Sequence, residues 1–360
     1  MAIRRNDPPP ELLAEMSRQR SEWERKERNF IERYGHARVP VCAKMGDKWL
    51  VIVGGGIYKQ TQEGPYGFMN VIHDHALLFF GVPFLEAEEA KPFAERHPAI
   101  QWMHTYVEHD ERLRNEGNAN LRARQIGSGA AWFRFAYDLF TIGDNARLQA
   151  RLKERLLEPR YFQAARHELR VAAQCVVAGF ELQFEDEQDN ARRHPEFVAT
   201  DKFSPLRIAV EVKSRHRRGV QGFESGRNIR PGDHVDIRQP VLEAYRKVSN
   251  LPFYVFIEAN LPPADEAEYR RWINEIDQTM FHLEAEGYAN PCSANAIFIT
   301  NDPSHYLGEN QIGNDSDYVW IKHFTAALPR VPHPPDNMVE RLLRAFEQRL
   351  SPPAELEEFV

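Results

Sequence analysis

The sequence has few cysteines and no excess of positive charge. Cys42, Cys175 and Cys292 are far apart in the 360-residue chain and lack the spacing of a structural zinc site. An odd number of scattered cysteines also argues against a disulfide framework, so we expect a reducing, cytoplasmic environment. With 46 basic residues against 53 acidic ones, the formal charge of −7 argues against a protein that coats nucleic acid over its whole surface. A local basic groove remains compatible with that total.

The chain also lacks a long hydrophobic run. Its longest apolar stretch, residues 76–85, is interrupted by Gly81 and Pro83 and is shorter than the roughly 20 residues that a membrane-spanning helix needs. The first residues have no apolar core of a signal peptide, so we expect no membrane association. At 42% hydrophobic and 28% charged residues, the composition is that of a globular protein with one large core or two modest ones.

Hydrophobic periodicity predicts the α/β class (α+β overall), with a mixed sheet flanked by helices and an N-terminal α+β region. Residues 1–125 form that region, whose role the sequence does not indicate, and residues 126–360 form a helical lead-in and the main domain. In the first region we expect a helix at 11–34 and strand-like segments at 39–58 and 66–84. In the second, the expected order is helix, three strands, helix and strand: 161–177, 180–184, 197–199, 206–212, 241–248 and 253–257.

The third of these strands carries charge on an otherwise apolar segment. Side chains alternate faces along a strand, so Glu211 and Lys213 share one face of the stretch Ile208-Ala209-Val210-Glu211-Val212-Lys213. The preceding strand begins Pro195-Glu196, and a hairpin would return Glu196 alongside Glu211. Two adjacent carboxylates need a cation or Lys213 to offset their repulsion. A hard divalent ion such as Mg²⁺ fits this arrangement.

The helix before the strands contributes a third acidic residue. Glu168 has small apolar residues three and four positions away on either side, which are its neighbours on the helix surface. We therefore weigh two readings of Glu168: an acid that faces the shared site, and a partly exposed acid at the edge of the apolar stripe.

This order resembles the PD-(D/E)XK superfamily of nucleases, the restriction-endonuclease-like fold. In that family a helix that often bears a glutamate precedes three strands, an acidic residue lies early in the second strand, and an acid-x-Lys triplet ends the third. Glu168, Pro195-Glu196 and Glu211-Val212-Lys213 follow the same order within residues 160–260. One departure is Glu196, because the family usually has Asp at this position.

The resemblance implies metal-assisted hydrolysis of phosphodiester bonds, with DNA favoured over RNA and a restriction or defence role by analogy. Glu196 and Glu211 would hold Mg²⁺ or Mn²⁺, and Lys213 would orient the attacking water or stabilise the developing negative charge. The basic loop that follows, with Arg215, Arg217 and Arg218, would bind phosphates. A homo-oligomer is compatible with the sequence.

A second function remains open beside the nuclease: a catalytically inactive module that keeps the fold and binds nucleic acid or a protein partner. In the simplest version of this alternative, the Glu/Lys triplet is a solvated strand end and the basic loop is a solvated surface. His73-Asp74-His75 has no second pair at metal-binding spacing, so we expect these histidines to be structural.

Overall fold

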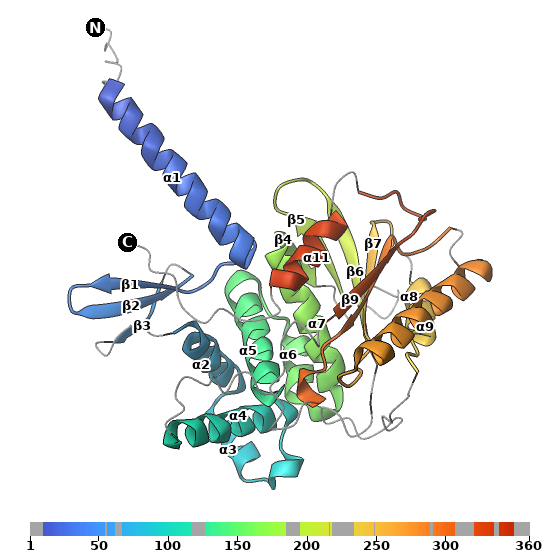
Figure 1. The fold of residues 1–360 in the computed structure, drawn as a ribbon, viewed down its shortest axis with the longest axis horizontal. Coiled ribbons are helices and arrows are strands. Elements are labelled where there is room, and N and C mark those ends of the chain that lie inside the picture. The colour runs from blue at the N-terminus through green and yellow to red at the C-terminus, as the bar shows by residue number, and fades with distance from the viewer. Residues whose placement is uncertain are drawn as a thin grey trace.

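The computed structural model describes residues 10–54, 56–61, 67–116, 127–184, 195–215, 217, 234–247, 249–288, 291–306, 320–334 and 338–348. The chain is mixed α/β, with a six-stranded mixed sheet flanked by helices and a separate three-stranded antiparallel sheet (Figure 1). The predicted fold class is therefore confirmed.

The N-terminal part begins with one long helix and a small sheet. Helix α1 (Pro10–Tyr34) extends away from the rest of the molecule (Figure 1). Three antiparallel strands follow in sequence order, as the prediction for residues 39–58 required: β1 (Val41–Met45), β2 (Lys48–Val53) and β3 (Gly56–Thr61).

The prediction of strands at 66–84 is wrong, because this segment forms helices. Helix α2 (Phe68–Phe80) buries Phe68, Val71, Ile72, Ala76 and Phe80, and this spacing places all five on one helical face. The aromatic and branched residues favoured a strand, but the helical period of the buried positions determines the structure. Four helical segments follow: α3 (Val82–Glu89), the 3₁₀ turn η1 (Phe93–Glu95), α4 (Pro98–Asn115) and α5 (Gly127–Asn145).

The predicted order of helix, three strands, helix and strand is present in the large sheet and its flanking helices. Strands β4 to β9 lie in sequence order across the sheet; β6, β7 and β8 are parallel to one another, and the remaining neighbours are antiparallel. The elements from α6 onward are α6 (Ala150–Leu157), α7 (Pro159–Val177), β4 (Phe180–Phe184), β5 (Phe197–Asp201), β6 (Arg207–Ser214), α8 (Arg238–Tyr245), β7 (Phe253–Glu258), α9 (Glu266–Ala285), β8 (Ala296–Asn301), η3 (Ser304–Tyr306), β9 (Trp320–Thr325) and α11 (Met338–Gln348).

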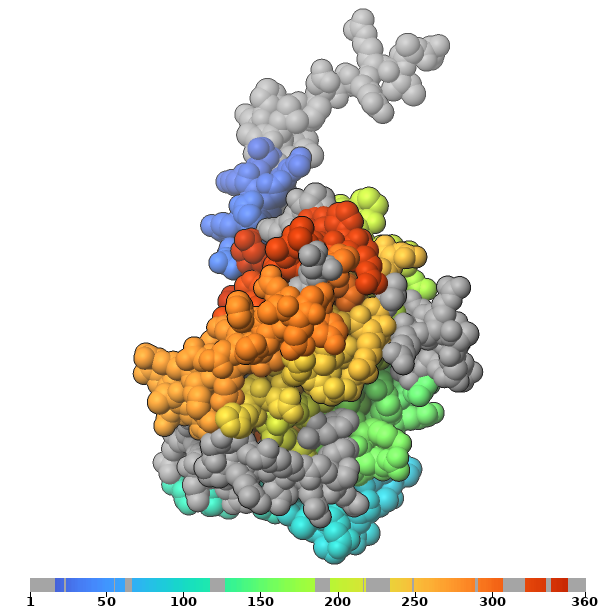
Figure 2. Space-filling view, turned by 90° about the vertical axis from the view of Figure 1, so that its right-hand side faces the viewer, coloured from blue at the N-terminus to red at the C-terminus, as the bar shows by residue number. Residues whose placement is uncertain are grey.

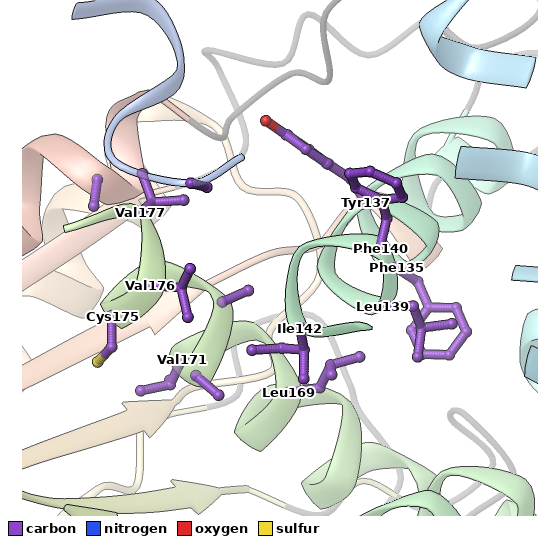
Figure 3. Close-up of a cluster of buried hydrophobic side chains, with 14 of the residues drawn as sticks. Phe135, Tyr137, Leu139, Phe140, Ile142, Leu169, Val171, Cys175, Val176 and Val177 are labelled. Atoms are coloured by element: carbon purple, nitrogen blue, oxygen red, sulfur yellow. The ribbon is translucent and has the colours of Figure 1, made fainter. Parts of the chain in front are cut away.

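Two hydrophobic cores cover the two faces of this sheet. The first holds Ile208, Val210 and Val212 of β6 together with buried residues of α5 and α7. Figure 3 shows apolar side chains of α5 and α7, including Ile142 and Leu169, in this core. The second core holds Ala209 of β6 together with residues of α8 and α9. Figure 2 looks onto the side of the molecule where α9 lies in orange.

The first core also crosses the predicted boundary at residue 125. It contains residues from the N-terminal part, such as Val51, Phe68 and Trp102, and residues of α7 and the large sheet. Packing thus joins the N-terminal α+β region to the main domain. Within the described residues, no single helix is long and apolar enough to cross a membrane; α2 and α3 pass that test only as a pair, bent by 85° between them.

Candidate active site

Strand pairing brings Glu196 opposite Glu211. In the antiparallel register of β5 and β6, Phe197 pairs with Val210 and Val198 with Ala209. Glu196 immediately precedes β5, and its backbone N–H donates to the carbonyl of Val210 at 2.9 Å. The sequence therefore places the two glutamates side by side through the hairpin register alone.

Alternation along β6 then decides which face carries the charge. Val210 and Val212 point into the core beneath α7, whereas Ala209 points into the core beneath α8 and α9. Glu211 and Lys213 are two and four residues after Ala209, so their side chains lie on the same face of β6 and project toward the α8 side of the sheet.

Four charged side chains meet on that side. The Nζ atom of Lys213 lies 2.6 Å from Glu211 Oε1 and 4.0 Å from Glu196 Oε1. The Nζ atom of Lys247 lies 2.6 Å from Glu211 Oε2 and 3.8 Å from Glu196 Oε1. Each ammonium group therefore contacts both carboxylates. We call these four residues the Glu–Lys cluster.

Burial within the cluster is unequal. The Glu211 side chain is 0% exposed, whereas those of Glu196 and Lys247 are 19% and 18% exposed. Burial raises the pKa of Glu211, and the charge of Glu196 adds to this, although Lys213 and Lys247 oppose it. Burial lowers the pKa of the Lys213 ammonium, but the contact with Glu211 outweighs it, so that pKa is raised. Glu211 is the desolvated centre, and Glu196 lies at its accessible rim.

Lys247 is the member of the cluster that sequence reasoning missed. It lies just beyond the end of α8, where its backbone N–H donates to the carbonyl of Ala244 at 2.9 Å. Its approach to Glu211 depends on how α8 packs across β6. A lysine 34 positions after Lys213 carries no spacing signal, so only the predicted helix at 241–248 could have pointed to this region.

The structure does not bring Glu168 to the Glu–Lys cluster, which corrects the first reading of that residue. Helix α7 packs on the face of β6 opposite to Glu211. The Glu168 side chain is only 4% exposed and forms an ion pair with Arg155 of α6. It is thus a buried acid, as the small neighbours suggested, but it faces another helix rather than the site. The spacing of the small residues around Glu168 indicates that its side chain is buried, but it does not indicate which element covers the side chain.

The predicted basic loop is also partly corrected. Arg215 is half-buried, and one of its guanidinium N–H groups donates to the carbonyl of His234 at 2.8 Å. Arg217 is only 1% exposed; its Nε donates to the carbonyl of Asn260 at 3.2 Å, and its backbone N–H donates to Gln163 Oε1 at 3.0 Å. Arg217 is therefore an internal residue rather than an exposed phosphate contact. Arg218 lies outside the described residues.

The histidines at 73 and 75 belong to α2. His73 Nδ1 accepts a hydrogen bond from Trp132 Nε1 at 3.0 Å, and the ring of His75 packs edge-on against Phe140 at 5.4 Å. These contacts account for the two side chains as parts of the helical packing.

The two carboxylates of the Glu–Lys cluster are oxygen ligands of the kind that a hard divalent cation prefers. Glu196 and Glu211 offer carboxylate oxygens around a common ammonium group, so this part of the sheet already attracts positive charge. Mg²⁺ is commonly held by one or two carboxylates, with waters and substrate phosphate oxygens as the other ligands. In the described part of the chain, no group of three or more His, Cys, Asp or Glu forms a complete protein cage. A divalent ion at the two carboxylates would therefore need water or phosphate oxygens as its other ligands.

Comparison with known proteins adds no relative: no family model, no curated protein and no solved structure matches the chain.

Proposed function

We propose that the protein is a divalent-metal-dependent nuclease of the PD-(D/E)XK type that hydrolyses phosphodiester bonds, in DNA rather than RNA. One observation carries the proposal: two carboxylates from adjacent antiparallel strands face the ammonium group of Lys213, at 2.6 Å from Glu211 and 4.0 Å from Glu196. This is the arrangement expected of an acid from the second strand beside an acid-x-Lys triplet from the third.

Each residue has a distinct task in this proposal. Glu196 and Glu211 would hold Mg²⁺ or Mn²⁺ through their carboxylate oxygens. When bound, the ion would supply Lewis-acid polarisation of the phosphate and a more acidic water. Lys213 orients the attacking water and stabilises the negative charge that grows on the phosphate oxygens. As the water oxygen bonds to phosphorus, the phosphorus–oxygen bond to the leaving nucleotide breaks; the water gives up a proton to solvent, and the leaving oxygen takes one from solvent.

An inactive nucleic-acid-binding or protein-binding module is the second candidate, and a specific observation favours it. Lys213 and Lys247 each lie 2.6 Å from Glu211, so two ammonium groups already balance the two carboxylates. A cluster neutralised in this way can serve as a structural ion-pair network. A restriction or defence role belongs only to the nuclease and stays a prediction.

Plasmid cleavage with Mg²⁺, Mn²⁺ or a chelator distinguishes the two candidates. For a nuclease, Glu211→Gln removes a metal ligand and Lys213→Ala removes the group that assists the water. Both should lower cleavage by on the order of a hundredfold or more, the scale of losing a key electrostatic group. Binding of DNA should persist in both variants. Glu181→Gln, on the exposed face of β4, is the matched control and should cleave like the wild type.

Circular dichroism should first establish that the variants are folded. If the wild type shows no metal-dependent cleavage, the inactive module is the better description. Cleavage that survives both Glu211→Gln and Lys213→Ala would mean that the Glu–Lys cluster is not the active site.

A further inference from the structure

Lys247 contacts the carboxylate oxygens that the proposed metal ion would need. Its Nζ atom lies 2.6 Å from Glu211 Oε2 and 3.8 Å from Glu196 Oε1. A hydrogen bond from Nζ to Oε2 accompanies the ion pair. No motif of the sequence and no part of the proposed reaction assigns a role to this lysine.

Charge makes the contact of Lys247 incompatible with a bound divalent ion. The two carboxylates and two ammonium groups of the Glu–Lys cluster sum to zero, and the nearby Glu243 carboxylate adds one negative charge, so an added divalent ion would still leave positive charge uncompensated. Glu211 is 0% exposed, so water screens this repulsion poorly. A Mg²⁺ ion also binds carboxylate oxygen at about 2.0–2.1 Å, and both Glu211 oxygens already face an ammonium group. One lysine must move aside for the ion to bind.

The proposed reaction, rather than side-chain freedom, distinguishes the two lysines: Lys213 is 24% and Lys247 18% exposed, and only Lys213 has a role in that reaction. Lys213 belongs to β6, where its backbone pairs with Ile257 of the parallel neighbour β7, and its side chain rises beside Glu211 on the same face. Lys247 follows the end of α8, where a backbone hydrogen bond to Ala244 links it to the helix. Both side chains have four rotatable bonds between Cα and Nζ. Lys247 can move aside without removing the lysine that the proposed reaction uses.

We infer that Lys247 is an internal counter-ion that competes with a divalent metal ion for Glu211, so that binding of the ion expels its ammonium group. The inference rests on the proposed function, because it concerns the same two carboxylates. Lys247 is thus a regulatory residue that sets how much metal the site requires.

Isothermal titration calorimetry of the full chain with MgCl₂ and MnCl₂ tests this competition without any measurement of cleavage. Lys247→Met keeps most of the side-chain length and removes the charge, so metal should bind about tenfold more tightly than to the wild type. Lys247→Gln keeps an N–H donor for Glu211 and guards against misfolding of the Met variant; it should also bind metal more tightly. Arg246→Met removes a charge from the adjacent exposed residue and should leave the affinity unchanged.

Thermal unfolding provides a second readout. Before metal is added, Lys247→Met should unfold at a lower temperature than the wild type, because buried Glu211 loses one of its two counter-ions. Saturating Mg²⁺ should raise its Tm more than that of the wild type, by a further few degrees.

The outcomes separate the inference from the proposed function. Metal binding of equal or lower affinity in both Lys247 variants would overturn the competition while leaving the metal-dependent nuclease intact. A tenfold gain of metal affinity in Arg246→Met as well would mean that any lost positive charge has this effect, and it would also overturn the inference about Lys247. Failure of wild type, Lys247→Met and Lys247→Gln alike to bind Mg²⁺ or Mn²⁺ would overturn both.

Discussion

His97 is a buried histidine whose surroundings keep it neutral. Its side chain is 0% exposed. Because the Leu156 carbonyl can only accept, Nε2 carries the hydrogen and donates at 3.0 Å, while Nδ1 accepts from the Ala99 N–H at 3.3 Å. Burial lowers the pKa of His97 to about 4, although nearby Glu88 and the Leu156 carbonyl act in the opposite direction. The neutral ring thus joins the start of α4 to the end of α6.

His97 should make stability depend on pH below about 6.5. In the unfolded chain the pKa of His97 is the ordinary histidine value of 6.5, whereas in the folded protein it is about 4. Stability is therefore complete above the unfolded pKa and falls as the pH drops from 6.5 toward 4, by up to about 3 kcal/mol. Urea unfolding at several pH values measures it. His97→Asn should lose less stability over this range than the wild type.

The control for His97 is an exposed histidine on α9, His282. His282→Asn should keep the wild-type pH profile. If His97→Asn also keeps that profile, protonation of His97 does not limit stability in acid.

The residues of the Glu–Lys cluster show which parts of a site can be read from a sequence. Glu196, Glu211 and Lys213 are close because of strand alternation and one hairpin register, and both are local consequences of the sequence. Lys247 and Glu168 depend on how helices pack across the sheet. Lys247 reaches Glu211 from α8, whereas Glu168 faces Arg155 on the other side of the sheet. Contacts of this kind have no signature in residue spacing.

At the scale of elements, an ionic cluster fixes two helices to the end of β8. Asp302 is 1% exposed, and its Oδ1 accepts from Arg134 of α5 at 2.9 Å. Its Oδ2 pairs with Arg170 and, at 3.8 Å, with Arg166, both on α7. Burial alone would raise the pKa of Asp302, but the three arginines hold it well below the usual value. The carboxylate is therefore ionised and ties α5 and α7 to the sheet.

Asp302→Asn should destabilise the protein strongly. It keeps the shape of the side chain but leaves three buried guanidinium groups without their common anion. Removing one partner from a buried ion pair costs about 3–5 kcal/mol in the free energy of unfolding. Urea denaturation measures this difference. The control is Asp277→Asn on α9, whose carboxylate is 45% exposed and pairs with Lys322 at 3.0 Å. That change should cost less than about 1 kcal/mol. Equal stabilities for the two variants would contradict the role of Asp302.

An element can be predicted from the sequence when the spacing of its apolar residues fits only a helix or only a strand. Strand β7 is a short, fully buried apolar segment after a loop, and its pattern predicted the strand at 253–257. In α2 the two signals disagree: its aromatic and branched residues favour strands, whereas the spacing of its buried residues is helical. The spacing of the buried residues agrees with the structure, and the composition does not.

At the scale of the whole molecule, the net charge of −7 makes the position of basic residues decisive for any contact with nucleic acid. The sequence suggested a run of exposed arginines after β6. The structure turns Arg217 inward, where it contacts Asn260 and Gln163. A charged residue three positions after a buried strand can face the interior when polar partners from distant parts of the chain meet it there.

Nucleic-acid binding should therefore depend on Arg215 and Arg218 rather than on Arg217. The double variant Arg215→Ala/Arg218→Ala should bind duplex DNA more weakly at low salt. Each lost phosphate contact should also reduce the slope of log affinity against log salt by about 0.9, so the double variant should lose up to about 1.8. Fluorescence anisotropy with a labelled duplex at several salt concentrations measures both the affinity and the salt slope.

The control is Arg151→Ala/Lys153→Ala, which removes two exposed charges from α6. Helix α6 packs on α7, and this variant should change neither the affinity nor the salt slope. Arg217→Ala should instead lower the Tm, because it empties the buried space of the side chain and removes the hydrogen bond from Nε to the Asn260 carbonyl. If the double variant binds with the affinity and salt slope of the wild type, DNA does not contact this loop. In that case the phosphate contacts lie on another surface of the molecule.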